Sequence, residues 1–213
     1  MNSSSIYKTR MLVMAMVMAL ALLPATSHAQ AVYITEEQPV AVQLHTNALY
    51  YAALSPNIGI EFQTNAGIAL QFDYVGAWWN STTKNRFFSN YAFQSELRYY
   101  LSHATHYEPF HGHHIGIYGQ MLTYDFEFGS KGYQSDDLKR SWAVGVAYGF
   151  TKPLSRHFSL DLTAGVGYFT SRYTVYEPYE YGYYATGHKK LSFFGPTRLE
   201  CSLIWNINLK NNK

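Results

Sequence analysis

The densest group of candidate metal ligands is a histidine-rich segment between residues 103 and 114. It contains His103, His106, His111, His113 and His114, so His-x-x-His and His-x-His spacings are both present. Such spacings can hold zinc or copper when the ring nitrogens converge. The segment offers Glu108 as its one acidic residue and has no cysteine. The simpler interpretation is a long turn whose histidines meet water, and we predict no metal site and no cofactor.

A second group is a tyrosine-rich segment near the C-terminus. Its members are Tyr173, Tyr176, Tyr179, Tyr181, Tyr183 and Tyr184. Tyrosine provides rigid contact area at low entropic cost and is typical of binding loops. One hypothesis is therefore a surface loop that recognises a protein or a glycan. The alternative is that two long strands continue through this segment and that the tyrosines belong to the aromatic ends of those strands.

Nucleophilic chemistry has weaker candidates. A lipid hydrolase needs a Ser or Thr beside a His. The clear outward-facing hydroxyls, in the strand pattern described next, are Thr46 and Ser95, and neither has an outward histidine beside it. His114 could approach the strand of Ser95, but the pattern does not fix its orientation. We assign no catalytic residue and predict that the chain is not an enzyme, with a lipid-modifying enzyme as the alternative.

The elements that must position these residues alternate apolar and polar side chains. From Leu199 to Leu209 the odd positions carry Leu, Cys, Leu, Trp, Ile and Leu, while most even positions are polar. A period of two is typical of a strand whose faces meet different surroundings. Seven further segments follow, at residues 42–47, 58–63, 68–74, 91–99, 114–128, 141–150 and 159–168. The apolar residues of segment 114–128 change parity, which predicts a bulge near Gly119–Met121.

The two faces of these strands differ in residue type. The polar face holds mostly Gly, Ala, Ser, Thr and Gln with almost no Lys, whereas the other face holds large apolar and aromatic residues. Small and polar residues suit a crowded interior, and the large apolar face suits lipid. Because lipid leaves no sheet edge unpaired, the sheet must close. The sequence therefore predicts an all-β fold, an eight-stranded antiparallel transmembrane β-barrel of the outer membrane.

Aromatic residues near the predicted strand ends would form girdles at the two membrane surfaces. They are Tyr50, Tyr51, Trp78, Trp79, Phe87, Phe88, Tyr99 and Tyr100. Long connections lie outside in such barrels. We therefore expect residues 80–86, 129–139 and 173–197 on the outer surface.

Charged residues on the predicted inner face form a polar network, made of Glu61, Asp73, Glu96, Arg98, Asp161, Arg198 and Glu200. Eight strands leave an interior just wide enough for side chains. Unpaired buried charges are costly, so we expect each arginine to bridge carboxylates and the lumen to be plugged. The excess of acids suggests that one carboxylate is protonated or that water and His45 share the charge. The alternative is a small water-filled pore.

A soluble periplasmic barrel with an apolar ligand inside is a third class. It would need the bulky apolar face to point inward, and eight strands enclose too little space for it.

The first 29 residues are typical of a secretory signal peptide. Lys8 and Arg10 precede an apolar run that Pro24 ends, and small residues precede a cut between Ala29 and Gln30. The run is shorter than the roughly 20 residues that a membrane-spanning helix needs. We predict four parts: a signal peptide at 1–29, a short N-terminal segment at 30–41, the barrel at 42–209 and a tail at 210–213.

The amino-acid composition limits the classes of molecule that this chain can bind. Charged residues are 14% and aromatic residues 17% of the chain, and the formal net charge of +2 resides in the leader. Without a basic surplus, a nucleic-acid partner is excluded. One cysteine excludes an internal disulfide framework. We expect outer-membrane lipid as the main partner.

Several short pieces carry a family resemblance. They are Thr46-Asn47-Ala48-Leu49-Tyr50, Pro56-Asn57-Ile58-Gly59-Ile60-Glu61, Glu96-Leu97-Arg98-Tyr99, Gly145-Val146-Ala147-Tyr148-Gly149, Gly165-Val166-Gly167-Tyr168 and Phe194-Gly195-Pro196-Thr197. In this order the chain resembles, over about residues 42–209, a family of outer-membrane barrels common in Bacteroidota called "domain of unknown function 3575".

The resemblance implies an eight-stranded barrel in the outer membrane with no assigned catalytic residues. Some members of the family are encoded beside fimbrial genes, which implies a structural or adhesion-accessory role with fimbrial or cell-surface proteins or glycans as partners. One departure concerns the C-terminus. Many outer-membrane barrels end on an aromatic residue, whereas this chain ends Leu209-Lys210-Asn211-Asn212-Lys213.

Overall fold

A computed structural model describes residues 40–64, 66–81, 86–104, 109–136, 140–155, 157–179 and 182–207. The predicted signal peptide, its cut between Ala29 and Gln30, and the predicted tail at 210–213 lie outside these residues. The described part is almost entirely antiparallel β-sheet. This confirms the all-β prediction.

Nine strands follow one another with little helix between them. They are β1 (Val40–Asn47), β2 (Asn57–Thr64), β3 (Ile68–Ser81), β4 (Arg86–Tyr100), β5 (Gly112–Phe128), β6 (Lys131–Ser135), β7 (Trp142–Pro153), β8 (Phe158–Tyr179) and β9 (Gly182–Ile207). The helices described are α2 (Ala48–Ala52) and a 3-10 turn at Leu101–Ala104. Neither of them is long and apolar enough to cross a membrane, and the described residues contain no other helix.

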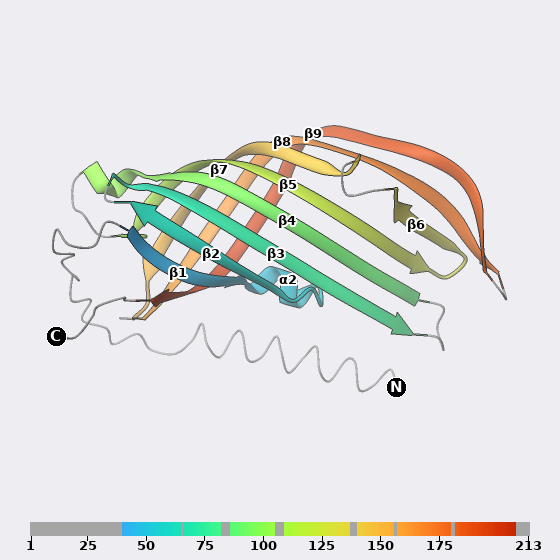
Figure 1. Cartoon of the computed structure of the whole chain (residues 1–213), viewed down its shortest axis with the longest axis horizontal. Helices are drawn as coiled ribbons and strands as arrows, with labels where there is room; N and C mark the ends of the chain where they lie inside the picture. Colours follow the sequence, from blue (N-terminus) through green and yellow to red (C-terminus); the bar gives the residue numbers. More distant parts are fainter. Residues whose placement is uncertain are drawn as a thin grey trace.

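Strand pairing forms a closed ring. Each of β1 to β4 pairs with its sequence neighbours, β4 pairs with β5, β5 with β7, β7 with β8, β8 with β9, and β9 returns to β1. All of these pairs are antiparallel, and the strands run obliquely across one another in Figure 1. Eight of the strands therefore each have a strand neighbour on both sides over part of their length.

The ninth strand lies in a segment that the sequence predicted as a loop. β6 pairs with the end of β5 and with Tyr173–Tyr176 of β8. It takes the position between those two strands beyond the point where β7 begins, at Trp142. The prediction of eight strands therefore missed one short strand at this end.

The longest strands extend well past the others. β8 has 22 residues and β9 has 26, and the pair projects beyond the ring as a long hairpin (Figure 1). The prediction of a loop at 173–197 was therefore wrong, because every residue of that segment that the structure describes is strand. The backbone agrees with the alternative, in which two strands continue through the tyrosine-rich segment.

The predicted bulge in β5 was also wrong. The register of β5 with β4 and with β7 runs without a shift through Gly119 and Met121. The shifts lie in the β8–β9 pair instead, at Gly165/Val166 and Val175/Tyr176. A single parity therefore holds along β5, which places His114 and Tyr118 on the inner face, where both are buried.

The two faces of the ring are inverted relative to a water-soluble protein. The buried set is dominated by polar and charged residues, and the exposed set by large apolar ones. Glu61, Glu96 and Asp161 are at most 1% exposed, while Ile117 is 66% and Leu199 65% exposed. The alternation read from the sequence is therefore the alternation between the inside and the outside of the ring.

Candidate functional site in the interior

The centre of the interior is an arginine surrounded by carboxylates. Arg98 of β4 donates from Nε to Glu96 at 2.7 Å and from Nη1 to Glu61 at 3.1 Å. Its Nη2 lies 4.0 Å from Asp161 and 3.9 Å from Glu200. These partners come from β2, β4, β8 and β9, so one guanidinium connects widely separated parts of the ring. Glu61 is also held by Gln43 at 2.7 Å and by the Tyr100 hydroxyl at 3.0 Å.

A second arginine completes the network. Arg198 donates to Glu200 at 2.6 Å and also to Glu96, so Glu96 accepts from both arginines. The Arg198 guanidinium carbon lies 5.3 Å from the centre of the Tyr118 ring, a cation–π distance. Tyr118 in turn shares a hydrogen bond with Thr197, beside the register shift of β9.

Two histidine–aspartate pairs extend the network. His45 Nε2 lies 2.5 Å from Asp73, which also accepts from Gln71 and Gln94. His114 Nε2 lies 2.8 Å from Asp161, which also accepts from Thr151 and Thr163. The His114 side chain is fully buried. The sequence predicted His45 as a partner of the carboxylates but not His114, because the wrongly predicted bulge left the orientation of His114 open.

The structure thus brings all seven predicted lumen residues into one connected interior cluster. Five carboxylates face two arginines and two histidines, and each carboxylate has at least one such partner. Each of the five carboxylates also forms at least one hydrogen bond with a neighbouring side chain. Charges buried to this depth are tolerated only when they are paired and hydrogen-bonded.

Glycines on neighbouring strands provide the space for these charged groups. A Cβ built on Gly59 would lie 2.1 Å from His45 Nε2, and one built on Gly116 would lie 2.0 Å from Glu96 Oε1. Both neighbours are buried and held by ion pairs, so they cannot move aside freely. The small residues of the inner face therefore fit a densely filled interior.

The prediction that Tyr100 belongs to an aromatic girdle was wrong, because its side chain lies in the interior. Tyr99 is 39% exposed, whereas Tyr100 is fully buried and contacts Phe110 edge to face. With Ala69 these two rings form a small apolar cluster at the β4–β5 end of the ring. The Phe110 N–H also donates to the Gln63 side chain. This cluster closes off the end of the charged network.

A separate polar knot joins β1, β2 and α2. Asn57 accepts from the Asn47 N–H at 2.6 Å and donates to the Asn47 carbonyl at 3.0 Å. The Asn47 side chain caps α2 by accepting from the Leu49 N–H at 3.0 Å, and it accepts from the Cys201 N–H of β9 at 3.2 Å. Thr46, a candidate nucleophile, donates to the Asn57 carbonyl at 2.9 Å and so serves this knot.

The other candidate chemistry is dispersed. Ser95 lies on the outward parity of β4, with Phe93 and Leu97, while His114 points to the inside and contacts Asp161. His113 faces outward, stacked on Tyr148, whose hydroxyl lies 2.7 Å from its Nδ1. Adjacent histidines of the predicted metal segment thus point to opposite faces. Among the described residues no group of three or more ligands suits a metal ion; His106 and the His103 side chain lie outside them.

The predicted tyrosine-rich loop is a strand hairpin in which the tyrosines face different surroundings. Tyr183 and Tyr184 are 72% and 71% exposed, whereas Tyr176 is buried and donates to Asp125 at 2.6 Å. Burial and that hydrogen bond raise the pKa of Tyr176 well above its ordinary value, so it remains a donor. Tyr173 is half-buried. The Tyr179 side chain and Tyr181 lie outside the described residues.

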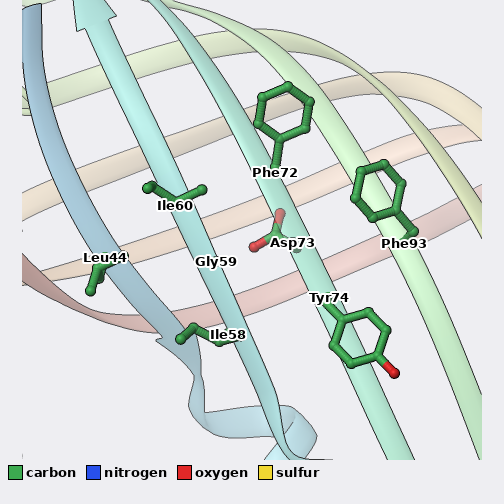
Figure 2. Close-up of a pocket in the computed structure, with 8 residues that line it drawn as sticks. All are labelled: Leu44, Ile58, Gly59, Ile60, Phe72, Asp73, Tyr74 and Phe93. Atoms are coloured by element: carbon green, nitrogen blue, oxygen red, sulfur yellow. The ribbon is translucent and has the colours of Figure 1, made fainter.

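A shallow apolar hollow lies on the outer face over β1 to β4. It has a volume of about 250 Å³ and is lined by Leu44, Ile58, Gly59, Ile60, Phe72, Asp73, Tyr74 and Phe93. Figure 2 shows the apolar side chains spread across these four strands rather than converging around a polar centre. Asp73 is bound by His45 and Gln71. The hollow therefore suits contact with an apolar chain.

Residues 14–207 match the model of one protein family, described as Protein of unknown function (DUF3575). The chain belongs to this family. Neither the curated proteins nor the solved structures contain a match.

The residues that carry the family resemblance surround the interior. Asn47 and Asn57 form the knot, and Glu61, Glu96 and Arg98 form the centre of the network. The glycine-containing pieces at 145–149 and 165–168 face each other across β7 and β8. The piece at 194–197 holds the register shift beside Tyr118. The pieces that carry the resemblance thus supply both buried interior residues, such as Glu61 and Glu96, and exposed outer residues, such as Val146 and Phe194.

Proposed function

We propose that this chain is an integral outer-membrane protein, an eight-stranded antiparallel β-barrel formed by β1–β5 and β7–β9. A signal peptide at 1–29, cleaved after Ala29, delivers it. The observation that carries the proposal is the inversion of its two faces, with charges inside and large apolar side chains outside. In water the outer face would be one continuous exposed apolar surface of a kind rare on soluble monomers. In lipid it is the stable arrangement.

Strand length supports the same conclusion. A tilted strand needs about 9–11 residues to cross a bilayer. Six of the eight ring strands, β3, β4, β5, β7, β8 and β9, have 12 or more residues and reach this length, whereas β1 and β2, with 8 each, fall just short of it. Pairing of each ring strand with two neighbours closes the sheet, and a bilayer favours closed sheets because they leave few strand edges unpaired.

The filled interior supports a non-conducting, non-enzymatic barrel of structural or adhesion-accessory type. Side chains from β2, β4 and β9 meet in the Arg98 and Arg198 clusters, an arrangement that would leave little room for a continuous water path. The β8–β9 hairpin would then stand outside the membrane. Its exposed Tyr183 and Tyr184 supply the contact surface for a fimbrial or cell-surface protein or glycan.

Membrane insertion is tested by fractionation and gel mobility. The full chain should be found in the outer membrane, and an unboiled sample should migrate differently from a boiled one, because a closed barrel resists detergent until heated. A heat-insensitive band in a soluble fraction would refute the proposal. Overexpression should leave the mass of outer-membrane lipids unchanged, and a change would indicate an enzyme.

The adhesion role is tested on the hairpin. Tyr183→Ser with Tyr184→Ser should reduce binding of cells to a matrix or to fimbriae, while Tyr51→Ser, at an exposed tyrosine of α2, serves as the matched control. Tyr183→Phe with Tyr184→Phe keeps the rings and should retain most of the binding. Unchanged adhesion in the serine variant would leave the barrel a structural role only.

A further inference from the structure

Two cations face one another on the outer surface of the β8–β9 hairpin. Arg172 of β8 and Lys190 of β9 are directly opposed in register, so both side chains leave the same face of the sheet, and both are exposed. Like charges in directly opposite positions destabilise a sheet. In the described part of the chain neither one has a carboxylate ion-pair partner.

The acidic residue beside this pair is engaged elsewhere. The Asp136 N–H donates to the Arg172 carbonyl at 3.0 Å. Its carboxylate accepts from Thr174 at 3.0 Å and lies 3.5 Å from Arg140. Asp136 therefore balances Arg140, and among the residues that the structure describes no carboxylate compensates the Arg172–Lys190 pair.

The height of the pair is set by the strand register. On the same face, Tyr168 opposes Phe194, then Thr170 opposes Ser192, then Arg172 opposes Lys190, with no shift between them. Phe194 is 77% exposed, and the pair marks the aromatic end of the apolar outer face. Four residues further along a strand is about 13 Å. At a tilt of about 45° this is roughly 9 Å along the membrane normal.

Interfacial aromatic side chains lie at headgroup level, and the polar layer of a bilayer adds about 5–8 Å beyond the hydrocarbon core. The cations therefore lie at the outer side of the headgroup layer. Their long side chains can reach back into it.

We propose that Arg172 and Lys190 form a binding site for the anionic phosphate of lipid headgroups in the outward-facing leaflet. The inference rests on the proposed membrane insertion and adds a specific lipid contact to it. The arginine supplies a planar fork that matches two phosphate oxygens, and the lysine supplies a compact second charge. A phosphate between them removes the like-charge repulsion that the bare pair carries.

The test uses the full protein in phosphatidylcholine nanodiscs that contain a minor fraction of diphosphoryl lipid A. Native mass spectrometry counts the lipid A molecules retained per protein. Each cation near a charged lipid surface contributes about fivefold, so Arg172→Gln with Lys190→Gln should weaken retention by about 30-fold. Lys152→Gln, at an exposed lysine at the opposite end of the ring, should retain lipid A as the wild type does.

Heat-dependent gel mobility is recorded on every sample, so failure of insertion is separated from failure of the lipid site. If the double variant inserts but retains as much lipid A as the wild type, the phosphate site is refuted and the proposed barrel is not. An equal loss in Lys152→Gln, or complete displacement of lipid A by dissolved inorganic phosphate, would also overturn it. A wild type that does not insert would overturn both proposals. Loss in the double variant alone would establish the site.

Discussion

Replacing Arg98 with methionine should be among the most destabilising single changes in the interior. Arg98 holds Glu96 at 2.7 Å and Glu61 at 3.1 Å, and it stands within 4.0 Å of Asp161 and Glu200. Its loss leaves four buried carboxylates beside Arg198 as the one remaining arginine. Breaking a buried pair in this way costs about 3–5 kcal/mol, because the partner charge remains uncompensated. We expect a loss of that size in the free energy of unfolding.

The assay is urea-induced unfolding in lipid vesicles, followed by the heat-dependent gel shift and by tryptophan fluorescence. The double variant Arg98→Met with Glu61→Gln removes one of the uncompensated charges, so it should unfold later than Arg98→Met alone. Lys152→Met, at an exposed position away from the network, should match the wild type. If Arg98→Met unfolds at the wild-type urea concentration, the idea of a tightly paired lumen is wrong.

Three further outcomes follow from the same interior. Gly116→Ala should destabilise the barrel by about 1–3 kcal/mol through overpacking against Glu96, whereas Gly119→Ala on the same strand, with open space around its Cβ, should be neutral or slightly stabilising in a thermal melt. Asn57→Ala removes the hydrogen bonds that tie β2 to Asn47, so protease should cut the α2 connection more readily. A variant that stays as intact under protease as the wild type would argue against the knot. The purified protein in a planar bilayer should show no steady ion conductance, and regular single-channel steps would favour the water-filled pore instead.

Period-two alternation predicted the strands of the ring because each of their faces meets a different environment. The positions of Glu61, Asp73, Glu96 and Arg98 on one face followed directly from it. A charged residue among small neighbours on an otherwise polar face is a strong signal for a buried network, because such a charge requires partners. The pairing of specific atoms depended on register, which alternation alone does not fix.

The long hairpin could not be predicted in the same way. From Gly182 to Lys190 nearly every residue of β9 is exposed on either face. A strand with water on both sides has no reason to alternate, so its sequence is like that of a loop. β6 escaped notice for a different reason: it has only five residues and follows the tight turn at Gly129, where φ is +73°.

The false bulge in β5 had a specific cause. Leu122 and Tyr124 are large and apolar yet share the inner parity with His114 and Tyr118. The Tyr124 hydroxyl forms a hydrogen bond with Ser171, so the tyrosine side chain fills the interior of the strand ring near its outer end. The size and polarity of the inner residues change along the axis of the strand ring. The bulge was predicted because every large apolar residue was taken to face outward. The correct parity would have placed His114 beside the carboxylates.

The most direct test of the central claim uses the native tryptophans in vesicles whose acyl chains carry bromine. Trp78 and Trp205 lie on the outer face, 66% and 51% exposed, near opposite ends of the ring. An outer face in contact with lipid predicts that brominated chains quench most of the fluorescence, while a water-soluble quencher has little effect. Strong quenching by the water-soluble agent, with none by the brominated lipid, would contradict the barrel in the membrane.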